Sequence, residues 1–354
     1  MTQNYTIDTT TPVTVTGASG YVAGWLVKRL LEAGATVHGT VRDAENATKT
    51  APLRELAEGT PGTLKLFSAD LLDEGSFDAP MSGCRVVFHT ASPFTLDTTS
   101  DAQKIFVEPA INGTRNVLEA ANRTNSVERV VVTSSCAAIY GDAIDYKLAP
   151  NGRFTEDVWN TTSGLEYGGY SYSKTMAERE AWKIAEAQDR WRLTTINPSL
   201  VMGPAVIGDT NSGSFEVLRM LGGGDMKMGA PRLAFGVVDV RDVAEMHLRA
   251  GFVDTAQGRY ITSGHNTDLL EMGKTLRKSF PDYPLPKSAL PKWLVWLVGP
   301  SQGIPRKFVS GNANVEMKID NSKSRTELGM SYRPMEETLN DMFTFAIEHN
   351  LLAK

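Results

Sequence analysis

The chain has 354 residues, of which 41% are hydrophobic and 22% charged, values close to the averages for soluble globular proteins. That length allows two or three domains, or one large α/β unit with an appended lobe, and the composition excludes a disordered, collagen-like or coiled-coil chain. With 36 basic and 41 acidic side chains the net charge is only -5, which lacks the broad positive field of nucleic-acid binders, so we expect no nucleic-acid partner.

From residue 13 onward, short β-branched runs alternate with longer helical patterns, which is typical of a parallel sheet. The pattern predicts strands at 13–16, 36–41, 63–67, 85–89, 129–133 and 192–197. Helical patterns cover 21–33, 103–121, 176–187 and 335–349. This order predicts an α/β fold with a doubly wound parallel sheet, the Rossmann fold.

Two regions interrupt the alternation. Residues 142–169 hold few apolar periods and many Gly, Asn, Asp and Thr residues, which predicts a long insertion over the sheet edge. After Pro198, Pro, Gly and Met become common. We therefore expect a mainly nucleotide-binding domain over 12–197, to which parts of 235–265 return, and a smaller C-terminal lobe over 198–350.

A glycine-rich turn joins the first strand to the first helix and reads Thr-Gly-Ala-Ser-Gly-Tyr-Val over 16–22. Its glycines permit the sharp turn and let backbone N–H groups approach a pyrophosphate, whose charge is favoured at a helix N-terminus. In this strand, turn and helix context, the motif predicts a dinucleotide site. The expected contacts come from Gly17, Ser19, Gly20, Tyr21 and Val22.

The end of the second strand bears on which dinucleotide binds. A NAD-specific fold usually places an acidic residue there, but this chain has Arg42, whose guanidinium suits a 2′-phosphate, and Lys49 could add a second positive charge. Asp43 could be an exposed helix cap or could turn inward to a ribose, so NAD stays open beside the favoured NADP(H). Asp70 and Leu71 follow the third strand and are expected at the adenine, although Asp70 could be only a cap.

A phenol and an ammonium lie four residues apart just before the helical run at 176–187. On a helix, this spacing places Tyr170 and Lys174 on one face. A nearby lysine favours the phenolate and lowers a tyrosine pKa that is otherwise about 10, which makes Tyr170 a usable proton donor. The pair therefore predicts a general acid for a carbonyl group.

Hydroxyl groups follow the strand at 129–133. Ser134 and Ser135 stand at the carboxyl end of a central parallel strand, the edge where ligands gather in such sheets. Both serines could simply terminate the strand, or one hydroxyl could bond the substrate oxygen opposite the tyrosine. The order of phosphate loop, serine and Tyr/Lys pair favours the catalytic interpretation.

Several motifs follow one another in the order of a known family. They lie at 16–20, 40–43, 73–78, 87–93, 132–135 and 170–174, with later matches at 197–204 and 238–244. The chain resembles the extended short-chain dehydrogenase/reductases over nearly its whole length. Within them it is most similar to the dihydroflavonol reductase, cinnamoyl-CoA reductase and microbial aldehyde reductase branch.

The resemblance implies a catalytic set of Ser135, Tyr170 and Lys174. The family's active serine is the second of its pair, and neighbouring side chains on a strand point to opposite faces, so Ser135 is preferred to Ser134. The resemblance also implies that Lys174 bonds the nicotinamide ribose.

Further cofactor contacts are implied by the same resemblance. It places Ala91 and Ser92, after the fourth strand, beside the middle of the cofactor. It places Pro198 and Val201 in the nicotinamide pocket. The variable region after Pro204 is expected to contribute to the substrate pocket, so the 198–350 lobe is expected to be mainly substrate-binding.

The chain departs from two branches of the family near the expected substrate. Flavonoid reductases carry an Asn five residues after the active serine, where this chain has Tyr140. Cinnamoyl-CoA reductases carry an Asn-Trp-Tyr-Cys-Tyr-Gly-Lys signature, where this chain reads Gly-Gly-Tyr-Ser-Tyr-Ser-Lys. These departures favour a free aldehyde or ketone, with a substrate pocket expected from Pro93, Phe94 and Tyr140.

The other reactive side chains are dispersed. The five histidines show no metal-ligand spacing, so no metal site is expected. His89 is expected to be a core histidine with a backbone hydrogen bond, although it could instead sit near the cofactor. Asn112 could belong to a proton path, or the neighbouring Gly113 could simply pack the helix. Cys84 and Cys136 show no disulfide or zinc spacing, and Cys136 is interpreted as a small buried residue.

Residues 1–12 lack the basic cluster and apolar run of a secretory signal, and the apolar run at 293–298 is far below the roughly 18 to 20 residues of a membrane span. We expect a cytoplasmic protein with no membrane partner, and a buried or interface helix at 293–298. The oligomeric state, monomer or homodimer, stays open.

These observations predict NADPH-dependent reduction of a small-molecule aldehyde or ketone to the alcohol. Tyr170 is the expected general acid, Ser135 orients the carbonyl and Lys174 holds the nicotinamide ribose. One alternative is an NAD(P)-dependent nucleotide-sugar epimerase or dehydratase, which Arg42 disfavours because those enzymes prefer NAD. Another is a non-catalytic NADP-sensing protein, although such proteins commonly lose the tyrosine or lysine present here.

Overall fold

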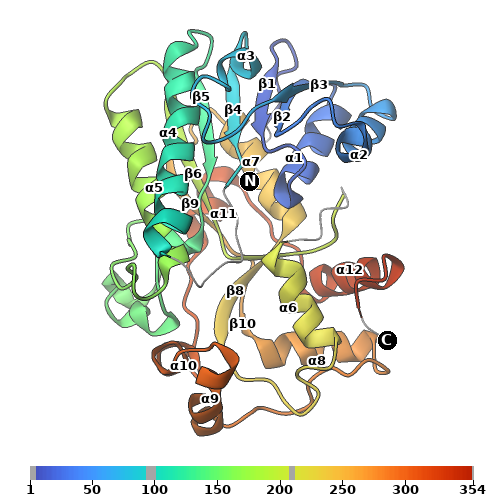
Figure 1. The fold of residues 1–354 in the computed structure, drawn as a ribbon, viewed down its shortest axis with the longest axis vertical. Helices are drawn as coiled ribbons and strands as arrows, with labels where there is room; N and C mark the ends of the chain where they lie inside the picture. Colours follow the sequence, from blue (N-terminus) through green and yellow to red (C-terminus); the bar gives the residue numbers. More distant parts are fainter. Residues whose placement is uncertain (1–4, 93–100, 207–211, 353–354) are drawn as a thin grey trace.

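The main layer of the fold is a parallel sheet. The computed structural model describes residues 5–92, 101–206 and 212–352, and among them this sheet has seven strands in the order β3-β2-β1-β4-β5-β6-β9 (Figure 1). The strands are β1 (Val13–Thr16), β2 (Thr36–Val41), β3 (Thr63–Ser68), β4 (Val86–His89), β5 (Arg129–Thr133), β6 (Arg192–Pro198) and β9 (Gly258–Thr262). The doubly wound fold is confirmed, and β9 is a strand that the sequence pattern did not predict.

Helices cover both faces of this sheet (Figure 1). They are α1 (Tyr21–Glu32), α2 (Ala47–Glu58), α3 (Asp78–Met81), α4 (Glu108–Arg123), α5 (Gly169–Glu186), α7 (Val240–Phe252) and α11 (Ser322–Leu328). α1 and α7 share one apolar core with Val131, whereas α4 and α5 share another with Val130 and Val132. Because β5 is buried on both faces, its three central residues, 130–132, are all valine.

The strand order reverses between β1 and β4, which are neighbours in the sheet. Ligands of doubly wound proteins bind at such a switch point, outside the carboxyl ends of the strands. The loops after β1, β4 and β5 therefore define where a site is expected.

A smaller lobe lies below the main sheet in Figure 1. In the described residues it has a three-stranded sheet in the order β10-β8-β7. Its elements are β7 (Leu200–Met202), α6 (Gly213–Gly222), β8 (Ala234–Asp239), β10 (His265–Asp268), α8 (Leu269–Ser279), α9 (Lys292–Val298), α10 (Arg306–Asn312) and α12 (Met335–Glu348). These elements surround a separate apolar core.

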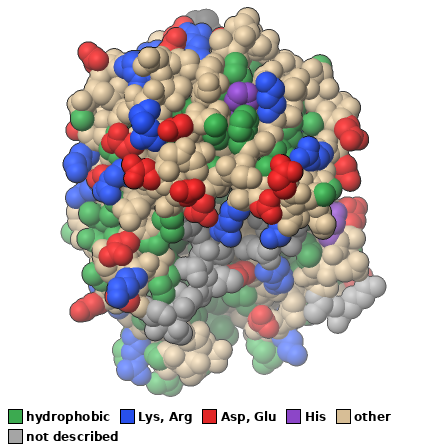
Figure 2. All heavy atoms as spheres, turned by 45° about the horizontal axis from the view of Figure 1, so that its top comes forward, with side chains coloured by type: hydrophobic (Ala, Val, Ile, Leu, Met, Phe, Trp, Pro, Cys, Tyr) green, Lys and Arg blue, Asp and Glu red, His purple; other side chains and the backbone are tan. Residues whose placement is uncertain are grey.

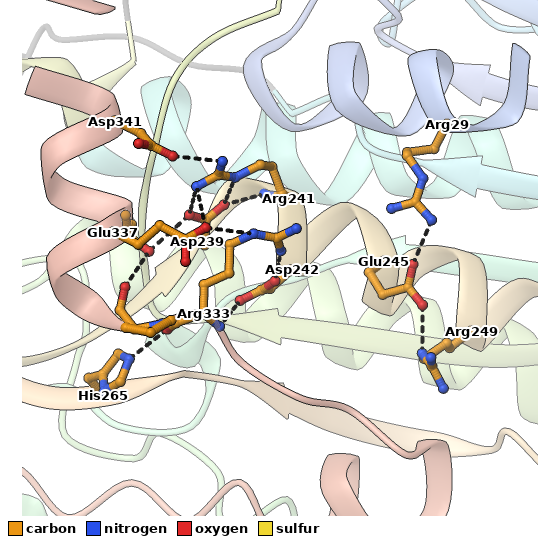
Figure 3. Close-up of polar contacts among 12 residues, drawn as sticks. Arg29, Asp239, Arg241, Asp242, Glu245, Arg249, His265, Arg333, Glu337 and Asp341 are labelled. Atoms are coloured by element: carbon orange, nitrogen blue, oxygen red, sulfur yellow. Dashed lines mark hydrogen bonds and ion pairs between the residues drawn. The ribbon is translucent and has the colours of Figure 1, made fainter. Parts of the chain in front are cut away.

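Charged side chains connect the lobe to α7 (Figure 3). Asp239, just before α7, pairs with Arg241 through two bonds of 2.9 and 2.7 Å, and Arg241 also pairs with Asp341 of α12 at 2.8 Å. The side-chain bond to Asp239 raises the pKa of the Arg241 guanidinium. Asp242 accepts from the Arg333 backbone N–H at 2.7 Å and also contacts the Arg333 guanidinium. These bonds attach the N-terminal end of α12 to the helix that packs on the main sheet.

The region 142–169 is irregular up to the start of α5, as its composition predicts, and contains the 3-10 turns Ala143–Lys147 and Pro150–Gly152. It lies against β9, the edge strand, because the Arg259 guanidinium donates to the backbone carbonyls of Glu156 and Val158 at 2.7 and 2.6 Å. The insertion therefore covers the edge that would otherwise be open.

The apolar run at 293–298 forms α9, but the prediction that this helix is buried is wrong for most of its residues. Val295 is buried, whereas Trp293 is 67% exposed and Leu297 57% exposed. The helix lies at the end of the lobe, so only one of its faces meets the core (Figure 1). Among the described residues, no helix has the length and apolar content to cross a membrane.

The surface has mixed charge. Figure 2 shows acidic and basic side chains interspersed over the face it draws. This mixture agrees with the nearly balanced composition of the chain. Within the described residues, no group of three or more His, Cys, Asp or Glu side chains could hold a metal ion.

Candidate active site

The glycine-rich turn closes tightly between β1 and α1, beside the switch point. Gly17 has a φ of 64°, a left-handed conformation that glycine adopts without strain. Its N–H donates to the Thr40 hydroxyl at 3.1 Å, and the Gly20 N–H donates to the Gly17 carbonyl at 2.9 Å. Because Gly20 precedes α1 and has no side chain to cap it, the helix N-terminus suits a bound anion.

The loop after β4 lies against this turn. A Cβ at Gly17 would lie 3.0 Å from both the Cα and the Cβ of Ala91, closer than such atoms normally approach. The next residue, Ser92, accepts a hydrogen bond from the Lys174 ammonium at 2.7 Å. The predicted contacts Ala91, Ser92 and Lys174 are thus brought together beside the phosphate loop. The cradle formed by this turn and the N-terminus of α1 fits a dinucleotide, and a side chain at residue 17 would push the loop after β4 away from it.

The tip of β2 presents an exposed Arg42 and an exposed Asp43. The Asp43 carboxylate accepts from the Glu45 N–H at 3.0 Å, in a turn. The cap of α2 is Asn46, whose side chain accepts from the Lys49 N–H at 3.1 Å, so a capping role for Asp43 is wrong. Lys49 and Arg54 of α2 are also exposed, and the Arg54 guanidinium lies 3.4 Å from the Ala44 carbonyl oxygen, so cations near this tip include these two and Arg42.

Asp70 and Leu71 follow β3. The Asp70 carboxylate accepts from the Leu72 N–H at 2.9 Å, so it stabilises its own turn. Leu71 packs against α4, where a Cβ at Gly113 would lie 3.1 Å from the Leu71 Cβ. Gly113 therefore packs the helix, and the side chain of the neighbouring Asn112 is exposed.

Tyr170 and Lys174 lie one turn apart on α5, which begins at Gly169, earlier than the pattern predicts. Tyr170 is 46% exposed, and the Lys174 ammonium lies 5.7 Å from the centroid of its ring. The expected pairing of phenol and ammonium on one helix face is therefore present. The hydrogen bond from Lys174 to Ser92 connects this pair to the loop after β4.

The two serines after β5 have different surroundings. Ser134 is buried, and its hydroxyl donates to the Glu178 carboxylate at 2.5 Å. Ser135 is half-buried, and its hydroxyl oxygen accepts from the Ala137 N–H at 3.1 Å, which caps a short 3-10 turn. The strand alternation that favours Ser135 for the site is thus present in the structure.

His89 lies in a small pocket behind Lys174, whose wall includes Ser92, Thr114 and Glu178. Its Nδ1 lies 2.9 Å from the Thr16 hydroxyl, so the expected backbone bond is wrong. The Thr16 oxygen already accepts the N–H groups of residues 90 and 91, at 3.2 and 3.1 Å. Its proton therefore goes to His89 Nδ1, which leaves the imidazole hydrogen on Nε2.

Burial, followed by the charge of Lys174, lowers the pKa of His89 to about 3, and burial lowers the pKa of His247 to about 4. Each imidazole has a pKa near 6.5 in the unfolded chain, but in the folded protein it stays neutral until the pH approaches these lower values. The free energy of unfolding is therefore greatest above about pH 6.5. It should decrease as the pH is lowered, by about 2 kcal/mol per histidine at pH 5. Urea unfolding across this range should show a smaller pH slope for His89→Asn, and an unchanged slope would contradict a neutral buried His89.

The expected substrate contacts have different outcomes. Pro93 and Phe94 lie outside the described residues. Tyr140 stacks on Phe154 with 4.4 Å between ring centroids, in an apolar cluster beside the insertion. Burial raises the pKa of the Tyr140 phenol well above its usual range, so this residue offers a neutral aromatic surface.

The last predicted cofactor contacts lie where the two sheets meet. Pro198 ends β6 and is buried, and Val201 follows in β7 and is half-buried. Tyr21, in the first turn of α1, donates its hydroxyl to the Gly203 carbonyl at 2.5 Å. Ser19 and Val22, the remaining predicted contacts of the glycine-rich turn, are half-buried.

Sequence reasoning missed several buried polar residues of this region. Thr16 and Thr40 hold the loops around the dinucleotide site, as described above. Glu178 and Arg259 form a buried ion pair at 2.7 Å. Two signals could have found this pair: Glu178 continues the four-residue spacing of Tyr170 and Lys174, and Arg259 stands in an otherwise apolar strand.

Comparison with known proteins identifies the family. Residues 13–255 match the model of the NAD dependent epimerase/dehydratase family. The chain belongs to this family. The resemblance to the extended short-chain dehydrogenase/reductases is thereby confirmed.

Curated relatives of the chain include several reductases. The tetraketide alpha-pyrone reductase 1 of Arabidopsis thaliana is 37% identical over 344 residues, which cover 96% of this chain and 97% of the relative. The cinnamoyl-CoA reductase CAD2 of Medicago truncatula is 38% identical over 332 residues, or 93% of each chain. The solved yeast methylglyoxal/isovaleraldehyde reductase Gre2, complexed with NADPH, has a TM-score of 0.77 at 27% identity and covers 96% of this chain and 100% of its own.

The protein is therefore a reductase of the extended type, an oxidoreductase that acts on carbonyl compounds and uses NADP(H). The choice of NADP(H) over NAD agrees with Arg42 at the tip of β2.

Replacing Gly17 with alanine should weaken NADPH binding by about tenfold or more. The left-handed backbone costs about 1 to 2 kcal/mol for alanine, and the added methyl group also meets Ala91 at 3.0 Å. The matched control is Gly34→Ala, which has a φ of 86° but no atom within 4 Å of the added Cβ. Fluorescence titration with NADPH should show weaker binding for the first variant alone, and equal affinity in both would contradict the role of the cradle.

Proposed function

We propose that this reductase converts a free aldehyde or ketone into the alcohol, with Tyr170 as the general acid and Ser135 orienting the carbonyl group. The supporting observation is the half-exposed Tyr170 over Lys174, on a helix that packs against the turn capped by Ser135. The Lys174 ammonium also reaches Ser92 beside the phosphate loop, which joins the proton donor to the cofactor site.

The roles follow from hydrogen-bonding chemistry. The Ser135 hydroxyl donates a bond to the carbonyl oxygen and holds it near Tyr170. The Tyr170 phenol then transfers its proton to that oxygen, which is the proton needed to form the alcohol. Bound NADPH supplies the hydride. Lys174 is proposed to hold the nicotinamide ribose, and Arg42 and Lys49 the 2′-phosphate.

The residues around Ser135 and Lys174 bear on the substrate class. Tyr140 presents an aromatic ring stacked on Phe154, where flavonoid reductases have an amide that can bond a hydroxylated ring. The segment before Lys174 also lacks the cinnamoyl-CoA reductase signature. The yeast relative is named for methylglyoxal and isovaleraldehyde, which are free carbonyl compounds. Together these features support a small free carbonyl substrate.

The test is the oxidation of NADPH with a panel of carbonyl compounds. The panel contains methylglyoxal, isovaleraldehyde, an aryl aldehyde, a simple ketone, a dihydroflavonol and cinnamoyl-CoA, with NADH in parallel. We expect kcat/KM for the best free carbonyl to exceed that for the flavonoid and the thioester by at least about tenfold. Turnover restricted to cinnamoyl-CoA or the dihydroflavonol would overturn the proposed substrate class.

A further inference from the structure

A buried ion pair lies beneath the proposed active site. Glu178 is on α5, one turn beyond Lys174 and two turns beyond Tyr170, on the same face of the helix. Its side chain is 0% exposed and pairs at 2.7 Å with Arg259 of β9, whose side chain is 8% exposed. The proposed chemistry uses neither residue.

The Glu178 carboxylate is an acceptor with donors all around it. Among the described residues, one oxygen accepts from the Arg259 Nε at 2.7 Å, the Thr195 hydroxyl at 2.9 Å and the Trp182 indole N–H at 3.3 Å. The other accepts from the Ser134 hydroxyl at 2.5 Å and the Asn197 amide at 2.8 Å. Every partner is a donor, so the site suits an ionised carboxylate and not an amide.

These donors surround the backbone that carries Ser135. Ser134 is its direct neighbour, and the Asn197 amide also donates to the Ser135 carbonyl at 3.1 Å. Past the turn, the Arg259 guanidinium donates to the Ala138 carbonyl at 3.4 Å. Both ends of the Ser135 turn are therefore bonded to the ion pair or to a residue that it holds.

A buried ion pair is a weak source of stability, because the attraction between the two charges only partly offsets the cost of removing both from water. Its hydrogen bonds, however, have a fixed geometry. Here those bonds run from α5, the helix of Tyr170 and Lys174, to the end of β5, the strand that precedes Ser135. They therefore join two elements from distant parts of the chain.

We propose that Glu178 is a positioning residue for the reduction: it sets the Ser135 turn in register with Tyr170 and Lys174. This inference rests on the proposed roles of Ser135 and Tyr170. Glu178 acts through Ser134 and Asn197 and does not touch the substrate. The effect of its loss should appear in kcat, because a catalytic group displaced by about 1 Å can cost about 100-fold in rate.

The first variant is Ser134→Ala, which removes one link and leaves the ion pair intact, so that it should fold. We expect kcat to fall by about tenfold and the KM for NADPH to stay within about twofold. The control is Trp182→Phe, which removes the indole N–H bond to the same carboxylate from a residue of α5 that, among the described residues, is bonded neither to Asn197 nor to the Ser135 turn. Its kcat should stay within about twofold.

The second variant is Glu178→Gln, whose amide places N–H groups against donors. We expect its kcat to fall by about 100-fold with NADPH binding retained, and Ser134→Ala should cost little more in that background, because the link is already broken. Unchanged kcat in Ser134→Ala, or an equal loss in Trp182→Phe, would overturn the proposal. Ser135→Ala and Tyr170→Phe separate the two ideas: if they keep their turnover, the proposed function fails, and if they alone lose it, only the role of Glu178 fails.

Discussion

Replacing Tyr170 with phenylalanine should lower kcat for carbonyl reduction by about 10³-fold, which is within the contribution typical of a general acid. The change removes only the phenolic oxygen from a side chain that is 46% exposed at the start of α5. The ring and its position over the Lys174 ammonium remain, so the fold should not change. The affinity for NADPH should stay within about twofold, because the phosphate loop and Arg42 are untouched.

The matched control is Tyr172→Phe. Tyr172 is on the same helix, but residues two apart point to different faces, and its fourth following residue is the uncharged Met176. We expect its kcat to stay near that of the parent protein in the same NADPH oxidation assay. A Tyr170→Phe variant that keeps most of its kcat would exclude Tyr170 as the proton donor.

Replacing Arg42 with alanine should raise the KM for NADPH by about tenfold or more while leaving the KM for NADH nearly unchanged. A hydrogen bond to a charged group contributes about 1.5 to 3 kcal/mol, and an exposed guanidinium is expected at the lower end of this range. NADH lacks the 2′-phosphate, so it loses nothing when Arg42 is removed. Asp43 cannot replace Arg42, because a carboxylate repels the 2′-phosphate.

The control for Arg42→Ala is Arg54→Ala. Arg54 is an exposed residue of α2 whose guanidinium lies 3.4 Å from the Ala44 carbonyl oxygen, so this variant removes the same charge from the same side of the molecule. Kinetics with both cofactors should separate a specific contact from a general electrostatic effect. An equal rise in KM for NADPH and NADH in Arg42→Ala would contradict a 2′-phosphate contact.

Much of the fold could be predicted because its signals are local. The strands from β1 to β6 are short β-branched runs, and the structure places their ends within one or two residues of the expected positions. The phosphate loop is likewise local, since Gly17 and Gly20 meet within one turn. The spacing of Tyr170 and Lys174 needs only a helix. Each of these features depends on residues close together in the chain.

The sequence patterns were less informative where distant segments meet. β9 pairs with β6 although it holds Arg259 in place of a continuous apolar run, and the partner of this buried charge, Glu178, comes from α5. The bond from His89 to Thr16 joins neighbouring strands, and no local pattern indicates it. The exposure of Trp293 is similar, because an apolar run shows that a helix can be buried but not whether the fold covers it.

The sequence by itself determined the α/β class, the dinucleotide turn, the cationic tip at Arg42 and the phenol and ammonium on one helix face, because backbone conformation and side-chain spacing over a few residues specify them. Only the tertiary structure decided which serine is buried against Glu178, which loop closes on Gly17 and which edge strand the insertion covers. Those choices depend on burying polar groups with satisfied hydrogen bonds, and the partners come from strands and helices far apart in the chain.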